Sequence, residues 1–101
     1  MAKKHFFLKL VPPRATFPYD ITDPEKSLMA EHAVYMKGQF EAGRGLVYGP
    51  VLAPTNAFGL AVLEVEDEAE ARRMLDADPT VLGGLNRYEI FPMMVAASRG
   101  S

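Results

Sequence analysis

The hydrophobic positions of this chain switch between the spacing of strands and the spacing of helices. The run HFFLKLV is rich in aromatic and branched residues and stops at two prolines, which predicts a first strand over residues 4–11. Asp23-Pro24 then predicts the start of a helix, because Asp caps free amide groups and Pro suits the first turn. This helix is expected to end near residue 42, before Gly43. One of its faces is predicted from residues spaced three and four apart: Leu28, His32, Tyr35, Met36 and Phe40.

Two more strands are predicted directly after this helix. The segment GLVYGPVLA predicts a strand over 45–53, and Pro50 favours the edge of a sheet because proline donates no hydrogen bond to a neighbouring strand. The segment AFGLAVLEV predicts a strand over 57–65. Its apolar residues fill both alternating sets, so both faces of this strand should be covered. The two sets are Phe58, Leu60 and Val62, and Ala61, Leu63 and Val65.

A second helix and a last strand complete the pattern. Asp67 is the expected cap of this helix, which ends before Asp78-Pro79 because the residue preceding proline avoids helical geometry. The segment PTVLGGL is expected to be a short turn, and NRYEIFPMMVA predicts a strand over 86–96. The order strand, helix, strand, strand, helix, strand predicts the ferredoxin-like α+β fold, with both helices on one face of an antiparallel sheet.

That fold would leave the other face of the sheet apolar and uncovered. A second copy of the chain is the simplest cover, so we expect a homodimer packed sheet to sheet about a two-fold axis. Which of the two apolar sets of the 57–65 strand faces the partner depends on the register of the strands, and the sequence leaves this open.

Composition narrows the function classes. The chain has 101 residues, a formal net charge of −2 and no cysteine, which fits one domain over residues 1–101 with a core at about 4–95. Disulfides and thiolate chemistry are excluded, and a cytoplasmic location is expected. The acidic balance argues against nucleic acid, and no segment has the apolar length of a membrane span. The polar end, 97–101, is expected to be disordered.

Two residues are candidates for chemistry. His32 shares the apolar helix face, and it is either a core histidine bonded to the backbone or a general base, since imidazole titrates near neutral pH. Asp78 is either a helix cap or a carboxylate that faces His32, and the two roles are compatible. His5 is expected at the surface. No metal site is expected, because two distant histidines without an acidic cluster do not supply three ligands.

Two longer segments carry a family resemblance. The first is MAEHAVYMKGQFEAGRGLVYGPV and the second is DEAEARRMLDADPTVLGGLNRYEIFPM. A His in the first helix, a Gly after it, GP in the second strand and DP after an acidic-capped second helix resemble the YCII-related (YciI-like) family. The resemblance implies a dimeric α+β barrel with a cleft that holds His32 and Asp78. Thr80 departs from the aromatic residue that often follows DP in this family, and the loop 12–23 is longer than in its shortest members.

The resemblance and the residues together suggest an enzyme that acts on a small organic molecule without a cofactor. His32 would move a proton in an elimination or an isomerisation, and Asp78 would orient it. Arg14, Tyr35, Tyr48 and Phe58 are the candidate substrate-binding residues, with Arg14 and Tyr48 as donors to a developing oxyanion. The alternatives are a binding module that uses the same cleft without catalysis and a dimerisation domain.

Overall fold

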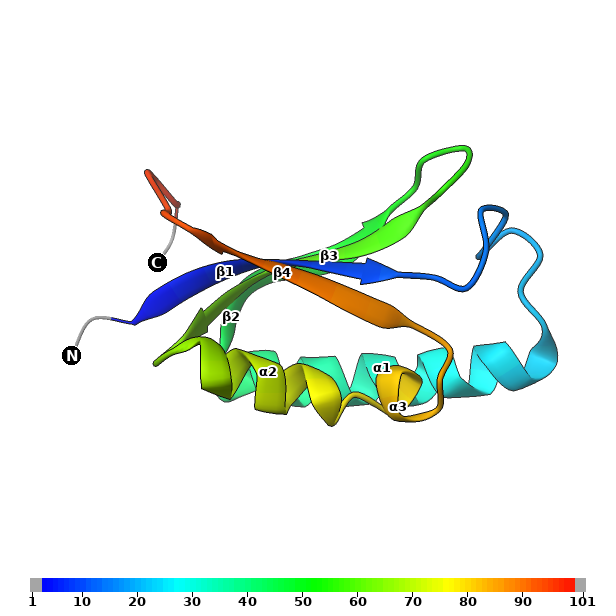
Figure 1. Cartoon of the computed structure of the whole chain (residues 1–101), viewed down its shortest axis with the longest axis horizontal. Coiled ribbons are helices and arrows are strands. Elements are labelled where there is room, and N and C mark those ends of the chain that lie inside the picture. The colour runs from blue at the N-terminus through cyan, green and yellow to red at the C-terminus, as the bar shows by residue number, and fades with distance from the viewer. Residues whose placement is uncertain (1–2, 100–101) are drawn as a thin grey trace.

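In the computed structural model, which describes residues 3–99, an antiparallel sheet forms one layer and the helices form the other (Figure 1). The four strands lie in the order β2-β3-β1-β4. This is the predicted ferredoxin-like order, with all helices on one face, so the predicted fold is confirmed. The elements along the chain are β1 (Lys4–Val11), α1 (Asp23–Glu41), β2 (Gly45–Val51), β3 (Phe58–Val65), α2 (Glu68–Asp76), α3 (Pro79–Leu82) and β4 (Arg87–Met93).

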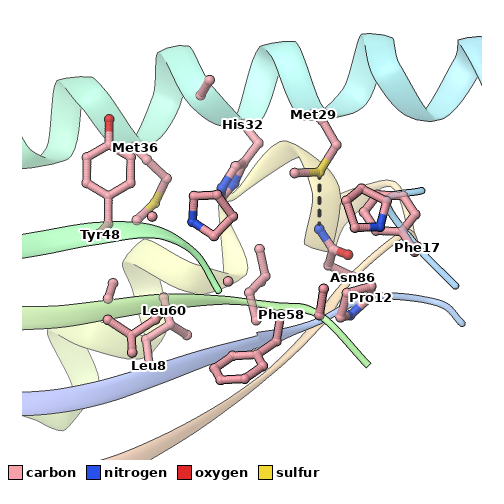
Figure 2. Close-up of a pocket in the computed structure, with 18 of the residues that line it drawn as sticks. Leu8, Pro12, Phe17, Met29, His32, Met36, Tyr48, Phe58, Leu60 and Asn86 are labelled. Atoms are coloured by element: carbon pink, nitrogen blue, oxygen red, sulfur yellow. Dashed lines mark hydrogen bonds between the residues drawn. The ribbon is translucent and has the colours of Figure 1, made fainter. Parts of the chain in front are cut away.

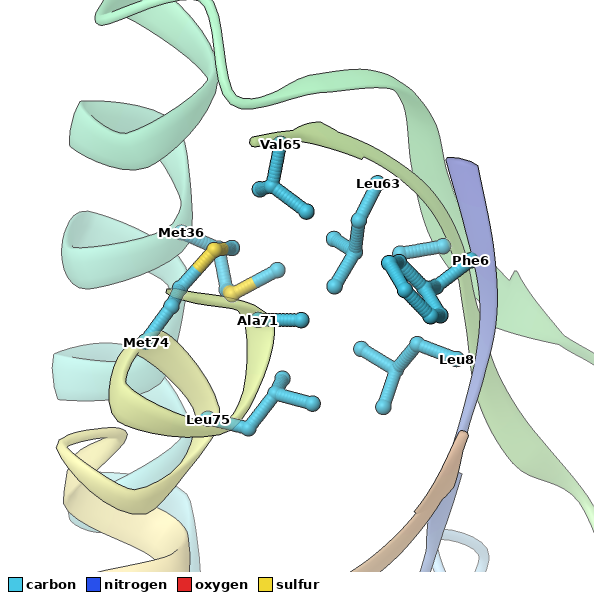
Figure 3. Close-up of a cluster of buried hydrophobic side chains, with 9 residues drawn as sticks. Phe6, Leu8, Met36, Leu63, Val65, Ala71, Met74 and Leu75 are labelled. Carbon is cyan, nitrogen blue, oxygen red and sulfur yellow. The ribbon is translucent and has the colours of Figure 1, made fainter. Parts of the chain in front are cut away.

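The core lies between the sheet and the helices (Figure 3). On β1, every second residue points to the helices, which buries Phe6 and Leu8. Leu8 pairs with Ala61 of β3 on one side and with Ile90 of β4 on the other, so the same face of three strands meets the helices. The remaining buried members of this core are Met36, Ala61, Leu63, Val65, Ala71, Met74 and Leu75.

The opposite face of the sheet carries an apolar row that crosses all four strands. Its members are paired across neighbouring strands: Val47 with Val62, Val62 with Phe7, and Phe7 with Phe91. Val47 is 52% exposed and Phe91 is 48% exposed, because the helices all lie on the other side of the sheet (Figure 1). We call Val47, Val62, Phe7 and Phe91 the outer apolar row. The register also places Leu60 on this outer face, opposite Lys9.

Several predicted boundaries need correction. Thr22, and not Asp23, caps α1: the Thr22 hydroxyl accepts a hydrogen bond from the Glu25 amide, and the Glu25 carboxylate accepts one from the Thr22 amide. These reciprocal bonds form a capping box, which makes Asp23 the first residue of the helix. The segment predicted as a turn forms α3, a single helical turn. Asp78 caps this turn with its side chain, and the backbone carbonyl of Asp78 accepts a hydrogen bond from the Leu82 amide.

The last three strands are shorter than predicted. β2 ends at Val51 rather than at residue 53, and β3 begins at Phe58 rather than at residue 57, because Val51 and Phe58 form the last pair before the turn. β4 ends at Met93 rather than at residue 96, because Met93 pairs with His5 near the beginning of β1. The residues that follow Met93 therefore have almost no partner strand.

Residues 97–99 form no helix or strand, and residues 100–101 lie outside the described residues, so disorder of the 97–101 tail stays a prediction. Within residues 3–99, no helix combines the length and the apolar character needed to cross a membrane.

Candidate active site

His32 and Asp78 form a hydrogen-bonded pair between two helices. His32 lies in the middle of α1, and Asp78 immediately precedes α3, 46 positions later. The distance between His32 Nδ1 and Asp78 Oδ2 is 2.6 Å, slightly shorter than the ~2.7–2.9 Å that is usual for a charge-assisted N–H···O hydrogen bond. The packing of α1 against α3 brings the two side chains together.

Asp78 is held rigidly by its second oxygen. Oδ1 accepts hydrogen bonds from the Thr80 amide and from the Thr80 hydroxyl, both at 2.8 Å. The two alternative roles of Asp78 therefore coexist, because Oδ1 caps α3 while Oδ2 meets His32. The Asp78 side chain is 1% exposed and the His32 side chain is 15% exposed, so only the imidazole has access to solvent or to a ligand.

The hydrogen bonds around Asp78 keep this buried carboxyl ionised. Burial by itself would raise the pKa of Asp78, but the hydrogen bond and the charge of His32, with the two hydrogen bonds from Thr80, outweigh it. The pKa of Asp78 therefore lies below its ordinary value of 3.8. An ionised Asp78 can only accept, so the Nδ1 atom of His32 carries the hydrogen of this bond. Nε2, on the other side of the ring, makes no hydrogen bond to the residues 3–99 and is the nitrogen available to a ligand.

A cavity of about 260 Å³ lies beside His32 (Figure 2). Its walls come from α1, the inner face of β1, β2 and β3, and the loop 12–22. Almost all of the lining is apolar. The polar side chains among the lining residues belong to His32, Tyr48 and Asn86, and none of the Lys, Arg, Asp or Glu side chains in residues 3–99 borders the cavity.

Two of the four predicted substrate-binding residues border the cavity and two do not. Tyr48 and Phe58 border the cavity. The ring of Phe58, however, is turned to the outer face of the sheet, where the Lys9 ammonium lies 4.8 Å from its centroid. Tyr35 does not border the cavity, because it packs against the core and its hydroxyl donates to the Met74 carbonyl at 2.6 Å. Burial, and then the nearby charge of Asp78, raise the pKa of this tyrosine.

Arg14 also lies away from the cavity, in contrast to its predicted role. Its guanidinium donates to both oxygens of Glu25, at 2.7 and 2.8 Å, and to the Asp20 carboxylate at 3.0 Å. The hydrogen bonds from Arg14 and from the Thr22 amide lower the pKa of Glu25 to about 2. Arg14 therefore ties the loop 12–22 to the first turn of α1, away from the cavity in which a developing oxyanion would lie.

The loop that Arg14 fixes is itself a wall of the cavity. Pro12, Phe17 and Pro18 border the cavity, and Phe17 is buried. The hydroxyl of Tyr19 donates to the Ala53 carbonyl at 2.7 Å, which ties the loop to the connection between β2 and β3. The loop 12–22 therefore forms part of the cavity wall.

Asn86 is a polar lining residue that the sequence did not single out. It is 6% exposed, and its Nδ2 donates to the Met29 sulfur at 3.6 Å. Its Oδ1 is buried and accepts no hydrogen bond from the described residues. An Asn directly before a strand is typical of a turn, so spacing and pattern offered no signal for a site residue here.

His5, the second histidine of the chain, lies away from this site. His5 is on the outer face of the sheet, where its Nε2 lies 3.0 Å from the Glu64 carboxylate. Within residues 3–99, no three His, Cys, Asp or Glu side chains converge in a way that could hold a metal ion.

The fold and the site together define a ferredoxin-like α+β protein with an apolar cavity beside a hydrogen-bonded pair of a partly buried His and a buried Asp. The model of the YCII-related domain matches residues 6–94, so the chain belongs to the YCII-related domain family, as its sequence motifs suggested. No match was found among curated proteins.

Among the solved structures that resemble the whole chain are two of SnoaB, a cofactor-independent oxygenase from Streptomyces nogalater. One has 16% sequence identity and a TM-score of 0.49, and a point mutant has 15% identity and a TM-score of 0.50. In each case the likeness covers 100% of this chain and 100% of the other. At this identity the likeness concerns the fold alone.

Proposed function

We propose that this protein is a small cytoplasmic enzyme that moves a proton on an uncharged organic molecule bound in the cavity. His32 is the general base and acid, and Asp78 orients it and stabilises its charged form. The observation that carries this proposal is the 2.6 Å hydrogen bond between His32 Nδ1 and Asp78 Oδ2, with His32 bordering an apolar cavity.

The pair supports proton transfer through Nε2. Because Asp78 accepts from Nδ1, Nε2 of the neutral ring holds a free lone pair toward the ligand. It takes a proton from a C–H or O–H group of the ligand, and the imidazolium formed is stabilised by the carboxylate. The same Nε2–H then returns the proton to another atom of the ligand or to a leaving group. General acid–base catalysis contributes about 10²–10⁴-fold, which suits an elimination or an isomerisation better than a difficult hydrolysis.

The cavity restricts the molecules that can react there. Within residues 3–99, no Lys or Arg side chain borders it, so no fixed positive charge offsets that of a carboxylate or a phosphate. Of the two donors predicted for a developing oxyanion, Tyr48 borders the cavity and Arg14 does not. An uncharged, largely apolar substrate therefore fits these walls best.

We also propose that the working form is a homodimer joined through the outer faces of the two sheets. The outer apolar row supports this, since exposed apolar surface that crosses a whole sheet favours a partner. A second copy presents the same row and meets it about a two-fold axis. The register supports contact through the set that contains Leu60, because Leu60 lies on the outer face and Leu63 is completely buried under the helices.

Exchange of hydrogen between a probe and solvent tests the proposed proton transfer without the natural substrate. Uncharged ring ketones with acidic C–H groups, 1-indanone and 2-tetralone, are incubated with the protein in D₂O, and the loss of the α-proton signals is followed by NMR. We expect faster exchange with the wild-type protein than in buffer, and a rate equal to that in buffer with His32→Gln. Equal exchange with the wild type and His32→Gln would contradict the role of His32.

The same experiment separates the enzyme from a binding module. If a ketone shifts the amide signals of residues around the cavity but exchanges no faster than in buffer, the cavity binds without catalysis. His32 is then a ligand contact, as the alternative derived from the sequence has it.

A further inference from the structure

Asn86 is a buried polar side chain that borders the cavity without a full set of partners. Its Oδ1 accepts nothing from residues 3–99, and the one contact of Nδ2 is the thioether of Met29, a weak acceptor. Buried side-chain polar atoms normally have a strong hydrogen-bond partner, and an unsatisfied one destabilises the free protein. A leucine of similar size would fill this place without that loss.

Hydrogen bonds to α3, the helical turn that Asp78 caps, fix the backbone of Asn86. The amides of Leu85 and Asn86 donate to the Thr80 carbonyl, at 2.9 and 3.0 Å. Thr80 also binds Asp78, so one short segment positions both the partner of His32 and the amide of Asn86. In Figure 2, His32 lies between Tyr48 on one side and Asn86 on the other, with Met29 above the Asn86 amide.

We propose that Asn86 is a specificity residue, and that it hydrogen-bonds an oxygen of the ligand while His32 meets another. The ligand class that this selects is an uncharged ring compound with two separate oxygen functions. This inference rests on the proposed function of the same cavity, because it takes the ligand to lie against His32. The terminal torsion of Asn is soft, so either the carbonyl or the NH₂ of the amide can turn to the ligand.

The size of the cavity agrees with a substituted ring. An apolar cavity of about 150 Å³ in another protein accepts benzene. The present cavity, of about 260 Å³, holds a ring with substituents that reach in two directions. Its apolar walls contact the ring, and the few polar lining groups then decide which substituents are accepted.

Two matched pairs of probes test the role of Asn86. 4-Hydroxyacetophenone and 4-isopropylphenol have similar shapes, and only the first carries a carbonyl oxygen beside its hydroxyl; the 3-substituted isomers form the second pair. The Kd of each probe is measured by NMR titration with the wild-type protein, with Asn86→Leu and with Met29→Leu. The last variant is the matched control, because it changes the thioether beside Asn86 and leaves the amide in place.

The measured quantity is the ratio of the Kd of the acetyl probe to that of its isopropyl partner. For at least one pair, we expect Asn86→Leu to raise this ratio by roughly three- to tenfold, the value of one neutral hydrogen bond. Met29→Leu should leave the ratio within about twofold of the wild type, by the same scale. Asn86→Ala replaces Asn86→Leu if the leucine variant does not fold.

Two results would overturn the inference. The first is an unchanged ratio in the Asn86 variant for both pairs, and the second is that none of the four probes binds the wild-type protein at millimolar concentration. Because binding and not turnover is measured, a failure here is distinct from a failure of proton exchange, which bears on His32.

Discussion

Replacement of Asp78 by Asn isolates the charge of the buried carboxylate. The substitution keeps the size of the side chain and leaves a carbonyl oxygen to accept from Thr80, as Oδ1 does at 2.8 Å. What changes is the 2.6 Å contact with His32, where a charge-assisted hydrogen bond becomes a neutral one. Hydrogen bonds to charged groups contribute about 1.5–3 kcal/mol and neutral ones about 0.5–1.5 kcal/mol, so we expect Asp78→Asn to lower the free energy of unfolding by about 1–2 kcal/mol near pH 6.

The effect should depend on pH with a definite sign. The pKa of Asp78 is lower in the folded protein than its ordinary value of 3.8. The ionised carboxylate therefore stabilises the fold fully above the unfolded value, and this stabilisation is lost as the pH falls through the lower, folded value. Urea unfolding at pH 6 and at pH 3 measures it, and the difference between wild type and Asp78→Asn should be smaller at pH 3.

A matched control is available in Asp23→Asn. The Asp23 side chain is 98% exposed and its ion pair with Lys26 is 3.8 Å long, so the same change of charge should leave the stability within about 0.5 kcal/mol of the wild type. A difference between wild type and Asp78→Asn that is equal at both pH values, or no larger than that of Asp23→Asn, would refute the reasoning.

Three further predictions concern the core, the loop and the sheet face. Leu75→Ala should lower the free energy of unfolding by about 2–5 kcal/mol because Leu75 is completely buried, while Val34→Ala, at a position 76% exposed, should change it by less than about 0.5 kcal/mol; urea unfolding checks both, and equal effects would contradict the packing. Arg14→Gln should raise the pKa of Glu25 from about 2 toward 4.5, and an NMR titration that still finds about 2 would remove Arg14 as its cause. Leu60→Asp should turn a dimer into a folded monomer of 11.1 kDa in light scattering, whereas Leu63→Asp should unfold the chain; a wild-type monomer at micromolar concentration would contradict the dimer.

The layers of the fold were predictable because each element carries its own periodic pattern. β1 alternates between buried and partly exposed residues, and the predicted bounds 4–11 match Lys4–Val11. The two-sided apolarity of β3 predicted cover on both of its faces; the helices cover one face, and cover of the other by a second copy stays a prediction. The ends of β2 and β4 were harder to predict, because a strand ends where its partner strand ends. The residues of one strand do not reveal which residues of another strand they pair with.

The site was predictable only in part. Spacing placed His32 on the buried side of α1. Its contact with Asp78, 46 positions away, was one of two alternatives that the residues left open, and the family resemblance favoured it. Arg14 was assigned to the ligand because the sequence does not reveal that Asp20 and Glu25 bind its guanidinium. Asn86 was overlooked because its isolation from partners is a property of the folded packing.

The tautomer of His32 is the most direct measurement of the central claim, that Asp78 holds Nδ1 and leaves Nε2 to exchange a proton with the ligand. Two-bond ¹H–¹⁵N correlation spectra of the histidine rings distinguish the two nitrogens, and His5 serves as an internal reference on the outer face of the sheet. For the neutral ring we predict hydrogen on Nδ1 and a free Nε2 in the wild type, and a shift toward the Nε2–H form in Asp78→Asn, whose amide can donate to Nδ1. A wild-type ring that carries its hydrogen on Nε2, or a tautomer that is the same in both proteins, would contradict the account.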